Sequence, residues 1–392
     1  MAAGEAATEL GVSRATLYAY VSRGYIRSEA RPGRGRERRY SREDVERLRR
    51  RNEERRDPEK AAGRVLQWGI PILESGITLI AGGRVFHRGH DVVELARRRT
   101  VEEVASLIWT GSFDTDFTET PLHVISGKSG DDGLPFVARA QSVLAVVSAR
   151  DPLSFDLRPR AVALTGWRIL NLLTSVAAQT RDLAPAIEET LVREWGGNGN
   201  AAELIRAALI LVADHELNVS SFTARCVASA GSNPYAVVLA GLAAIEGTKH
   251  GGASIRVESL LESLRRSRTL DASIAERLRR GEVIEGFGHR LYRDGDPRAA
   301  ALMAMLEERY PKSRELDFAR RLAASAESIL GEKPTIDFAL AVLARVLDLP
   351  KGSPLTLFAL GRTIGWIGHA IEQYASGEMI RPRARYVGEK PH

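Results

Sequence analysis

The chain has 392 residues, of which 44% are hydrophobic and 27% are charged. This composition is typical of a folded globular protein and excludes a disordered or fibrous chain. The single cysteine, Cys226, excludes an intrachain disulfide and any zinc or iron–sulfur site built from several thiolates. The net charge of +6 is concentrated at the start, because residues 1–60 hold 16 Lys and Arg against 11 Asp and Glu.

The sequence indicates a cytoplasmic location. Its N-terminus lacks the pattern of a secretory signal, and no stretch approaches the run of about 18 apolar residues that a membrane span requires. The lone cysteine favours a reducing compartment. We therefore expect a cytoplasmic protein with no membrane partner and a basic N-terminal segment that is suited to phosphate groups.

The first expected elements form a helix-turn-helix. Helix-forming residues from Ala2 to Leu10 end at Gly11, a natural helix terminator. Ser13 is a suitable N-cap for a second helix that runs through Val21. Two helices joined by a tight turn are therefore expected.

An arginine-rich turn and a third helix complete this N-terminal module. Residues 31–36 hold turn-forming Pro and Gly between arginines, and a helix is expected to begin at Ser41, which would form a capping box with Asp44. The charged, apolar-poor residues 49–58 are typical of a solvated helix end or a linker. We place the first domain in residues 1–60.

The segments EAATELGVSRATLYAYVSRGYI and RRYSREDVERL resemble the winged helix-turn-helix of MerR-type and excisionase-type regulators. The resemblance implies that the second helix enters the major groove of duplex DNA, with Arg14, Thr16 and Tyr18 near bases or phosphates. It also implies a wing of arginines against the DNA backbone, formed by Arg34, Arg36, Arg38 and Arg39. A helical appendage that mediates protein contacts is the alternative interpretation.

Short strands are expected between residues 65 and 85, around the turn Ala81-Gly82-Gly83, and they would form the only sheet. The rest of the chain is predicted to be helical from its capping residues. Thr100 with Glu103 forms a capping box ahead of a stop at Gly111, and Asn200 with Glu203 repeats that pattern.

Three further helix starts are predicted at Asp271, at Asp296-Pro297 and at Ser353-Pro354. Gly281 would end the first of these helices. Residues 113–134 and 190–199 are polar and glycine-rich and are expected to be loops. The predicted fold class is mainly α, with a many-helix domain in residues 61–392 and a small winged helix-turn-helix before it.

Four histidines lie in motifs beside glycine or polar residues. These motifs are Asp214-His215-Glu216-Leu217-Asn218, Lys249-His250-Gly251-Gly252-Ala253, Gly286-Phe287-Gly288-His289-Arg290 and Ile367-Gly368-His369. Glycine lets a ligand approach a ring closely, although each histidine taken alone is more often structural. Together with Asp296-Pro297-Arg298, Thr335-Ile336-Asp337-Phe338, Arg362 and Arg381-Pro382-Arg383, their order resembles the citrate synthase family from about Ile77 to Gly388.

The resemblance implies a large and a small helical subdomain, with the small one, roughly residues 240–345, inserted in the large one. It also implies condensation of an acyl-CoA with oxaloacetate. Asp337 would remove a proton from the acyl carbon, and His250 would donate a hydrogen bond to the thioester oxygen as it becomes enolate-like. His289 would polarise the keto carbonyl of the oxoacid.

The remaining implied roles concern binding. His215, Arg298 and Arg362 would bind the oxoacid, because arginine offers a forked donor that matches a carboxylate. Arg381 would reach the site of a neighbouring subunit, so a homodimer is expected. Arg293 would contact a CoA phosphate or, equally, be a solvated surface arginine. No metal site is expected because no HExxH spacing appears, and no cofactor is implied beyond the CoA thioester substrate.

The sequence departs from the family beside these groups. Ser254 and Ile255 follow the HGGA motif where the family usually has Asn and often Glu, and Ala339 follows Phe338 where Tyr is common. These departures leave the acyl substrate open between acetyl-CoA, which would give citrate, and propionyl-CoA, which would give 2-methylcitrate. They also leave open a transcription regulator that uses a low-activity synthase domain as a metabolite sensor.

Overall fold

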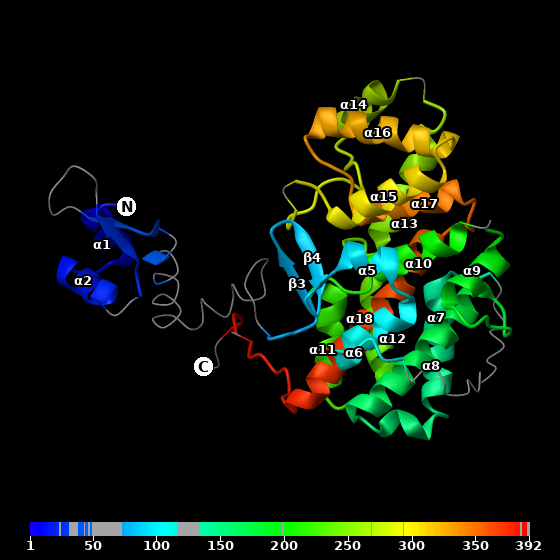
Figure 1. The fold of residues 1–392 in the computed structure, drawn as a ribbon, viewed down its shortest axis with the longest axis horizontal. Helices are drawn as coiled ribbons and strands as arrows, with labels where there is room; N and C mark the ends of the chain where they lie inside the picture. Colours follow the sequence, from blue (N-terminus) through cyan, green and yellow to red (C-terminus); the bar gives the residue numbers. More distant parts are fainter. Residues whose placement is uncertain are drawn as a thin grey trace. The chain divides into compact units, whose positions relative to one another are not determined.

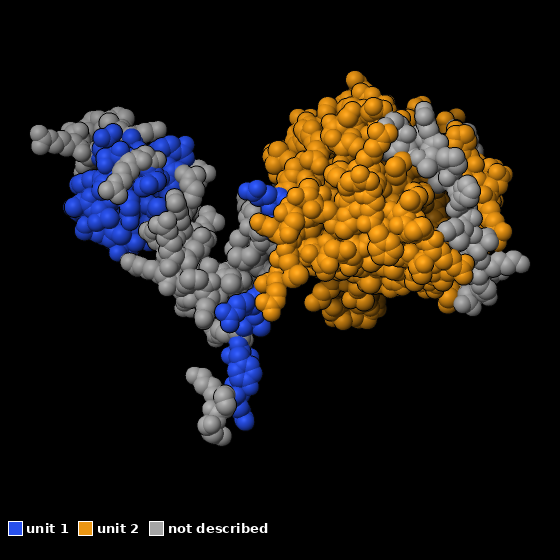
Figure 2. Space-filling view, turned by 90° about the horizontal axis from the view of Figure 1, so that it is seen from below, with its two compact units in different colours: residues 1–74, 382–392 blue, residues 75–381 orange. Residues whose placement is uncertain are grey.

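The structure is a computed structural model, and it describes residues 1–22, 25–30, 38–42, 44–45, 48, 73–115, 133–197, 200–267, 269–292, 294–384 and 386–389. The chain divides into unit 1, Met1–Glu74 with Pro382–His392, and unit 2, Ser75–Arg381 (Figure 2). Each unit has its own cluster of buried hydrophobic residues. The predicted boundary near residue 60 lies outside the described residues.

Unit 1 contains the predicted helix-turn-helix with a two-stranded wing. Its elements are α1 (Ala3–Leu10), α2 (Arg14–Ser22), β1 (Ser28–Ala30) and β2 (Arg38–Tyr40), and the strands pair antiparallel. Gly11 ends α1 in the left-handed conformation with φ 60°, as predicted. The Ser13 Oγ accepts a 3.2 Å hydrogen bond from the Thr16 N–H and so caps α2.

Asp44 joins two parts of unit 1 through a buried carboxylate. Ser41 Oγ accepts from the Asp44 N–H at 3.3 Å, which is half of the predicted capping box. The other half is absent because the Ser41 N–H donates to Arg27 O. The Asp44 carboxylate instead accepts from the Arg27 N–H at 2.9 Å and from Arg27 Nε at 2.8 Å. The predicted arginine turn at residues 31–36 and the linker at 49–58 lie outside the described residues.

Unit 2 begins with a three-stranded antiparallel sheet of β3 (Thr78–Ala81), β4 (Arg84–His87) and β5 (His90–Asp91). The two-residue turn between β3 and β4 consists of Gly82 and Gly83, with φ 58° and 72°. Positive φ at both positions suits a tight hairpin, so glycine is required there. The hairpin confirms the prediction, but the expectation of a single sheet is wrong because β1 and β2 form another.

Helices build the rest of the described part of unit 2 and confirm the mainly α fold (Figure 1). The first group is α5 (Val92–Arg98), α6 (Val101–Thr110), α7 (Phe136–Ser148), the 3-10 helix η2 (Pro152–Phe155), α8 (Pro159–Ala178), α9 (Ile187–Trp195) and α10 (Ala201–Leu211). The second group is α11 (Val219–Ser229), α12 (Pro234–Ile245), α13 (Gly252–Leu264), α14 (Leu270–Arg279), α15 (Pro297–Arg309), α16 (Arg314–Leu330), α17 (Ile336–Val346) and α18 (Ser353–Ser376).

Several predicted caps are confirmed. Thr100 and Glu103 form the reciprocal capping box of α6, and Gly111 ends that helix with φ 81°. Asp296 caps α15 by accepting from the Arg298 N–H at 3.0 Å, with proline at the first helical position. The local sequence therefore determines these helix ends.

Other predicted boundaries are wrong. Residues 190–195 belong to α9, which buries Ile187 and Leu191, rather than to a loop. Asn200 makes no side-chain cap, and Glu203 instead pairs with Arg309 at 2.8 Å.

Two helix starts differ by a residue or two. The helix predicted to start at Asp271 begins one residue earlier and ends before Gly281. Ser353 is the first residue of α18 rather than its cap, because Gly352 takes the N-cap position in the left-handed conformation.

Helix α18 forms the centre of unit 2, and it is buried along most of its 24 residues. It packs against α8, α10, α11 and α12, whereas α13 to α17 gather toward one end of the unit (Figure 1). Gly365 lets the α18 backbone approach the segment after α10, where its N–H donates to Ala213 O at 3.0 Å. Helix α8 is long and apolar enough to span a membrane, but 72% of its apolar window is buried inside the unit, which is typical of a core helix.

Candidate active site

Three side chains with rings meet where the segment after α10 faces the loop before α15. His215 is buried, and its Nε2 lies 2.6 Å from the hydroxyl of Tyr292. The ring centres of His215 and His289 are 5.3 Å apart, and those of His289 and Tyr292 are 4.7 Å apart. The structure thus brings together two predicted site histidines and adds Tyr292, which sequence analysis missed although it lies three residues after His289.

The hydrogen bond to His289 fixes its tautomer. The Leu291 N–H donates to His289 Nδ1 at 3.2 Å, so this nitrogen is an acceptor. Burial and the nearby Arg298 lower the pKa of His289, so the ring is neutral near pH 7. A neutral ring with an acceptor at Nδ1 carries its proton on Nε2, where it can donate to a ligand.

His250 lies in the turn before α13 and is held by α11 and α18. Its Nε2 is 2.8 Å from Ser220 Oγ, and the Trp366 Nε1 donates to the same oxygen at 3.2 Å. Burial and the charge of Arg362 lower the pKa of His250 to about 4. His250 is therefore a neutral imidazole near pH 7 and offers a ligand a hydrogen bond rather than a positive charge.

Asp337 is the second residue of α17. The Ser254 Oγ donates a 2.5 Å hydrogen bond to Asp337 Oδ1. Burial raises the pKa of Asp337, against the hydrogen bond from Ser254 and the charge of Arg298, which favour the ionised form. The result is a carboxylate base in a poorly solvated position.

The two predicted carboxylate-binding arginines are buried but differ in their partners. Arg298 is 2% exposed and donates two hydrogen bonds to the Asp296 carboxylate, from Nε at 3.0 Å and from Nη2 at 2.8 Å. Asp296 also accepts from the Ile336 N–H at 3.0 Å, which ties Arg298 to the start of α17. Arg362 is 1% exposed, its Nε donates to Val212 O at 2.9 Å, and its guanidinium lies 4.8 Å from the Phe358 ring centre.

The six predicted residues form one interior cluster, because their charges act on one another. Arg298 and Arg362 both influence the pKa of Asp337 and of His215, whose pKa burial lowers well below its usual range. Burial also lowers the pKa of Arg362, to about 10, which leaves it charged near neutral pH. The cluster consists of His215, His250, His289, Arg298, Asp337 and Arg362.

A second network of buried polar side chains adjoins this cluster through Asp214, the residue before His215. Asp214, next to His215, accepts from Thr78 Oγ1 at 2.6 Å and lies 3.1 Å from His369 Nε2. Although burial alone would raise it, His369 holds the pKa of Asp214 well below its usual range. Because the ionised Asp214 takes the Thr78 proton, His87 Nδ1, 2.9 Å from the same Oγ1, must be the donor in that pair. Burial lowers the pKa of His87 to about 4.

The two remaining predicted site residues are Arg381 and Arg293. Arg381 is exposed on the extended segment that follows α18, and it is not among the charges named as shifting the pKa of the site groups. Arg293 lies outside the described residues.

The predicted DNA-contact residues lie on α2 and β2 of unit 1. Arg14 and Tyr18 are exposed, Tyr18 by 52%, whereas Thr16 Oγ1 is 2.9 Å from Ser13 Oγ and belongs to the cap of α2. Arg38 and Arg39 are exposed on β2. Arg34 and Arg36 lie outside the described residues.

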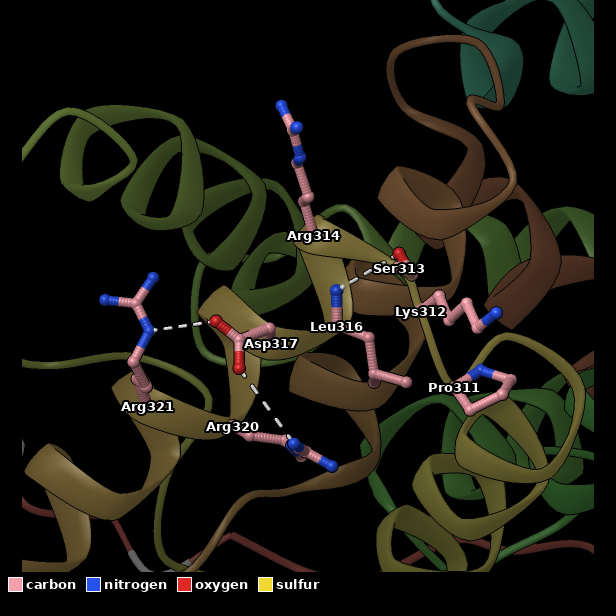
Figure 3. A pocket seen from close by; sticks show the side chains of 8 residues that line it. All are labelled: Pro311, Lys312, Ser313, Arg314, Leu316, Asp317, Arg320 and Arg321. Carbon is pink, nitrogen blue, oxygen red and sulfur yellow. Dashed lines mark hydrogen bonds and ion pairs between the residues drawn. The ribbon is translucent and has the colours of Figure 1, made fainter.

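A hollow of about 360 Å³ lies away from the cluster, at the start of α16 (Figure 3). Two of its four cations, Arg320 and Arg321, pair with the exposed Asp317. None of its lining residues belongs to the histidine cluster. Buried titratable groups of opposite sign, rather than this hollow, therefore mark the candidate active site.

Comparisons with known proteins agree with this assignment. The family "Citrate synthase, C-terminal domain" matches residues 161–383, and a helix-turn-helix domain family matches residues 3–53. A citrate synthase from Haloferax volcanii is 32% identical over 360 residues, which cover 82% of this chain and 95% of that protein. A 2-methylcitrate synthase from Shewanella oneidensis is 28% identical over 351 residues, covering 80% of this chain and 91% of that protein.

A comparison with solved structures also finds citrate synthases. The crystal structure of citrate synthase from Thermotoga maritima matches with a TM-score of 0.70 and 27% identity, covering 84% of this chain and 97% of that one. Fold and matches together define a helical acyltransferase with an N-terminal helix-turn-helix domain. The chain belongs to the citrate synthase family, and its activity is of the citrate or 2-methylcitrate synthase type.

Proposed function

We propose that this protein condenses acetyl-CoA with oxaloacetate and water to give citrate and CoA. The observation that carries the proposal is the cluster itself, in which a desolvated carboxylate lies among neutral histidines and buried arginines. A carbon acid needs a base placed beside it and donors that stabilise the enolate as it forms. Reduced solvation strengthens both effects.

The first step forms an enolate. Asp337 takes a proton from the acyl methyl group, and the electron pair of that C–H bond moves toward the thioester oxygen. His250 donates a hydrogen bond to this oxygen. The Ser220 hydroxyl has a single proton, which in the structure it donates to Asn218 Oδ1 at 2.8 Å. The proposed role requires this hydroxyl to turn and donate to His250 Nε2, 2.8 Å away, because only then is the proton of the neutral His250 ring on Nδ1, where it is available to the substrate.

The second step forms the carbon–carbon bond. The enolate carbon attacks the keto carbon of oxaloacetate, the π electron pair of the C=O bond moves onto the keto oxygen, and His289 Nε2–H stabilises the negative charge that develops there. Arg298, Arg362 and His215 bind the carboxylates and orient the oxoacid. Water then hydrolyses the thioester and releases CoA.

Propionyl-CoA is the alternative acyl substrate, and it would give 2-methylcitrate. The similarity to the Shewanella oneidensis enzyme supports this alternative. One methylene changes binding by only about 1 to 3 kcal/mol, so the ratio of kcat/KM for the two thioesters decides between them.

A free-thiol assay tests the proposal. The purified protein is incubated with oxaloacetate and either thioester, with Asp337→Asn as the matched variant. We expect CoA release by the natural protein and a loss of at least about 100-fold in the variant, because general bases typically contribute that much. CoA release by Asp337→Asn at the natural rate would refute Asp337 as the base.

We also propose a homodimer in which Arg381 serves the partner's site, which agrees with its exposure and its absence from the site of its own chain. Complementation tests this role. Asp337→Asn and Arg381→Ala are each inactive as homodimers, but a hybrid has one site with both natural residues. Random mixing should restore about a quarter of natural activity. No recovery, with hybrids verified by mass, would place Arg381 elsewhere.

The helix-turn-helix domain supports a second function, that of a cytoplasmic transcription regulator. Its exposed Arg14 and Tyr18 on α2 and Arg38 and Arg39 on β2 are suited to duplex DNA. A dimer would present two such domains to a palindromic site, and ligands of the synthase domain could then influence DNA binding.

Salt dependence tests this second function. Affinity for a pool of genomic duplex fragments should fall steeply with salt, because several arginines displace counterions from phosphates. Arg14→Ala should weaken binding while CoA release stays unchanged. If the dimer bound no duplex fragment at low salt, the proposed DNA-binding function would be refuted. DNA binding combined with tight ligand binding but no CoA release would favour the metabolite-sensor form of the hypothesis.

A further inference from the structure

Ser254 makes the shortest polar contact to the carboxylate of Asp337. Ser254 lies in the first turn of α13, it is fully buried, and its Oγ is 2.5 Å from Asp337 Oδ1. An ionised carboxylate can only accept, so the serine hydroxyl is the donor. A hydroxyl that donates to a charged oxygen forms a short and strong bond.

This contact makes the two carboxylate oxygens different. Oδ1 accepts from Ser254, whereas Oδ2 accepts no hydrogen bond from the described residues. With Oδ1 held, rotation of the carboxylate is restricted and Oδ2 is the oxygen left for the substrate. A base that is held in one orientation spends more of its time in the reactive geometry.

The same serine is coupled to the other proposed catalytic side chain. His250 lies four residues before Ser254, in the turn that leads into α13, and the Ser254 N–H donates to Gly251 O at 3.0 Å. One short segment therefore carries both the donor for the thioester oxygen and the donor for the base.

We propose that Ser254 is a positioning residue for the carbon base: its hydroxyl holds Asp337 Oδ1 so that Oδ2 takes the proton, and its hydrogen bond favours the ionised form of the carboxylate. The inference rests on the proposed role of Asp337. Burial opposes ionisation of this group, and the Ser254 bond is the side-chain hydrogen bond that counters it. Removing the hydroxyl should therefore raise the pH at which the base becomes active.

The test is the pH profile of kcat for Ser254→Ala with saturating substrates. We expect the acid limb to move to higher pH by about one to two units, because loss of a hydrogen bond to a charged group changes a pKa by about that much. The plateau kcat should fall by about 10-fold because orientation is lost. The KM for oxaloacetate should stay unchanged. Ser254→Thr, which restores a hydroxyl, should return the acid limb toward its natural position.

Two further variants make the test decisive. Ser353→Ala removes another buried hydroxyl, one without a hydrogen-bond partner among the described residues, and should leave the acid limb in place. Ser254→Cys keeps the side-chain volume with a weak donor, and it takes the place of the alanine variant if that one does not fold. An acid limb that is unmoved in the variant without the hydroxyl, or moved equally in Ser353→Ala, overturns the inference. Natural turnover by Asp337→Asn would instead overturn the proposed base.

Discussion

Gly365 determines how closely α18 approaches the segment that carries His215, and its replacement by alanine tests that contact. A Cβ at this position would lie 2.5 Å from Ala213 O and 2.6 Å from Asp214 Oδ1. Real Cβ atoms essentially never approach so closely, so one backbone must move away from the other. The 3.0 Å hydrogen bond from the Gly365 N–H to Ala213 O would lengthen at the same time.

The expected loss of stability follows from opposing effects. Glycine to alanine inside a helix gains up to about 1 kcal/mol. Overpacking in a buried position costs about 1 to 3 kcal/mol, and the weakened hydrogen bond costs about 0.5 to 1.5 kcal/mol. A net loss of about 1 to 3 kcal/mol should lower Tm by about 2 to 5 °C in a unit of about 300 residues.

Function should change with stability, because His215 lies two residues beyond Ala213. A displacement of the order of 1 Å near a binding group can reduce turnover by about 100-fold, so kcat/KM for the oxoacid should fall between about 10-fold and 100-fold. Thermal melting and the CoA-release assay measure the two effects. Gly4→Ala is the control, since in α1 the new Cβ meets only the end of the Arg14 side chain at 3.3 Å. An unchanged Tm and unchanged kinetics in Gly365→Ala would refute the close approach.

Three further predictions follow from single contacts. Arg362→Lys keeps the positive charge but loses the Nε–H that donates to Val212 O at 2.9 Å. KM for the oxoacid should therefore rise at least about 10-fold in steady-state kinetics. An unchanged KM would contradict the proposed role of Arg362 in binding the oxoacid. His87 has its pKa lowered to about 4 by burial, whereas the unfolded chain takes up a proton below about 6.5, so stability falls as the pH drops. Between pH 7.5 and 5.5 this group should account for about 1 kcal/mol, and melting curves of His87→Gln should lose that part of the slope; parallel slopes would count against it. Asp44→Ala removes the buried acceptor of Arg27 and should destabilise the helix-turn-helix domain by about 1 to 3 kcal/mol, abolishing any DNA binding while CoA release persists; unchanged DNA binding would contradict this.

Local signals predicted much of the fold. The glycine turn at residues 82–83, the capping box of Thr100 and the cap at Asp296 each depend on residues within four positions, and all three are confirmed. The predictions failed where a distant partner competed for the same group. Glu203 pairs with Arg309 across 106 residues instead of completing a cap with Asn200.

The site was predictable as a set of motifs but not as a set of contacts. The order of the histidine, arginine and aspartate motifs was sufficient to choose the residues that the structure brings together. The partners that tune them lie far away in the chain: Ser254 is 83 residues from Asp337, and Thr78 is 136 residues from Asp214. No periodicity or capping rule relates positions so distant, because only tertiary packing makes them neighbours.

Asp296 links the side chain of Arg298 to the start of helix α17. Its carboxylate accepts a hydrogen bond from Arg298 Nη2 and another from the N–H of Ile336, the residue before Asp337. One carboxylate therefore links Arg298 to the helix that carries Asp337, whereas Arg362 lies on the long central helix and is held by Val212 O. Under the proposed binding roles of the two arginines, the distance between their guanidinium groups would decide which chain length of dicarboxylate contacts both of them.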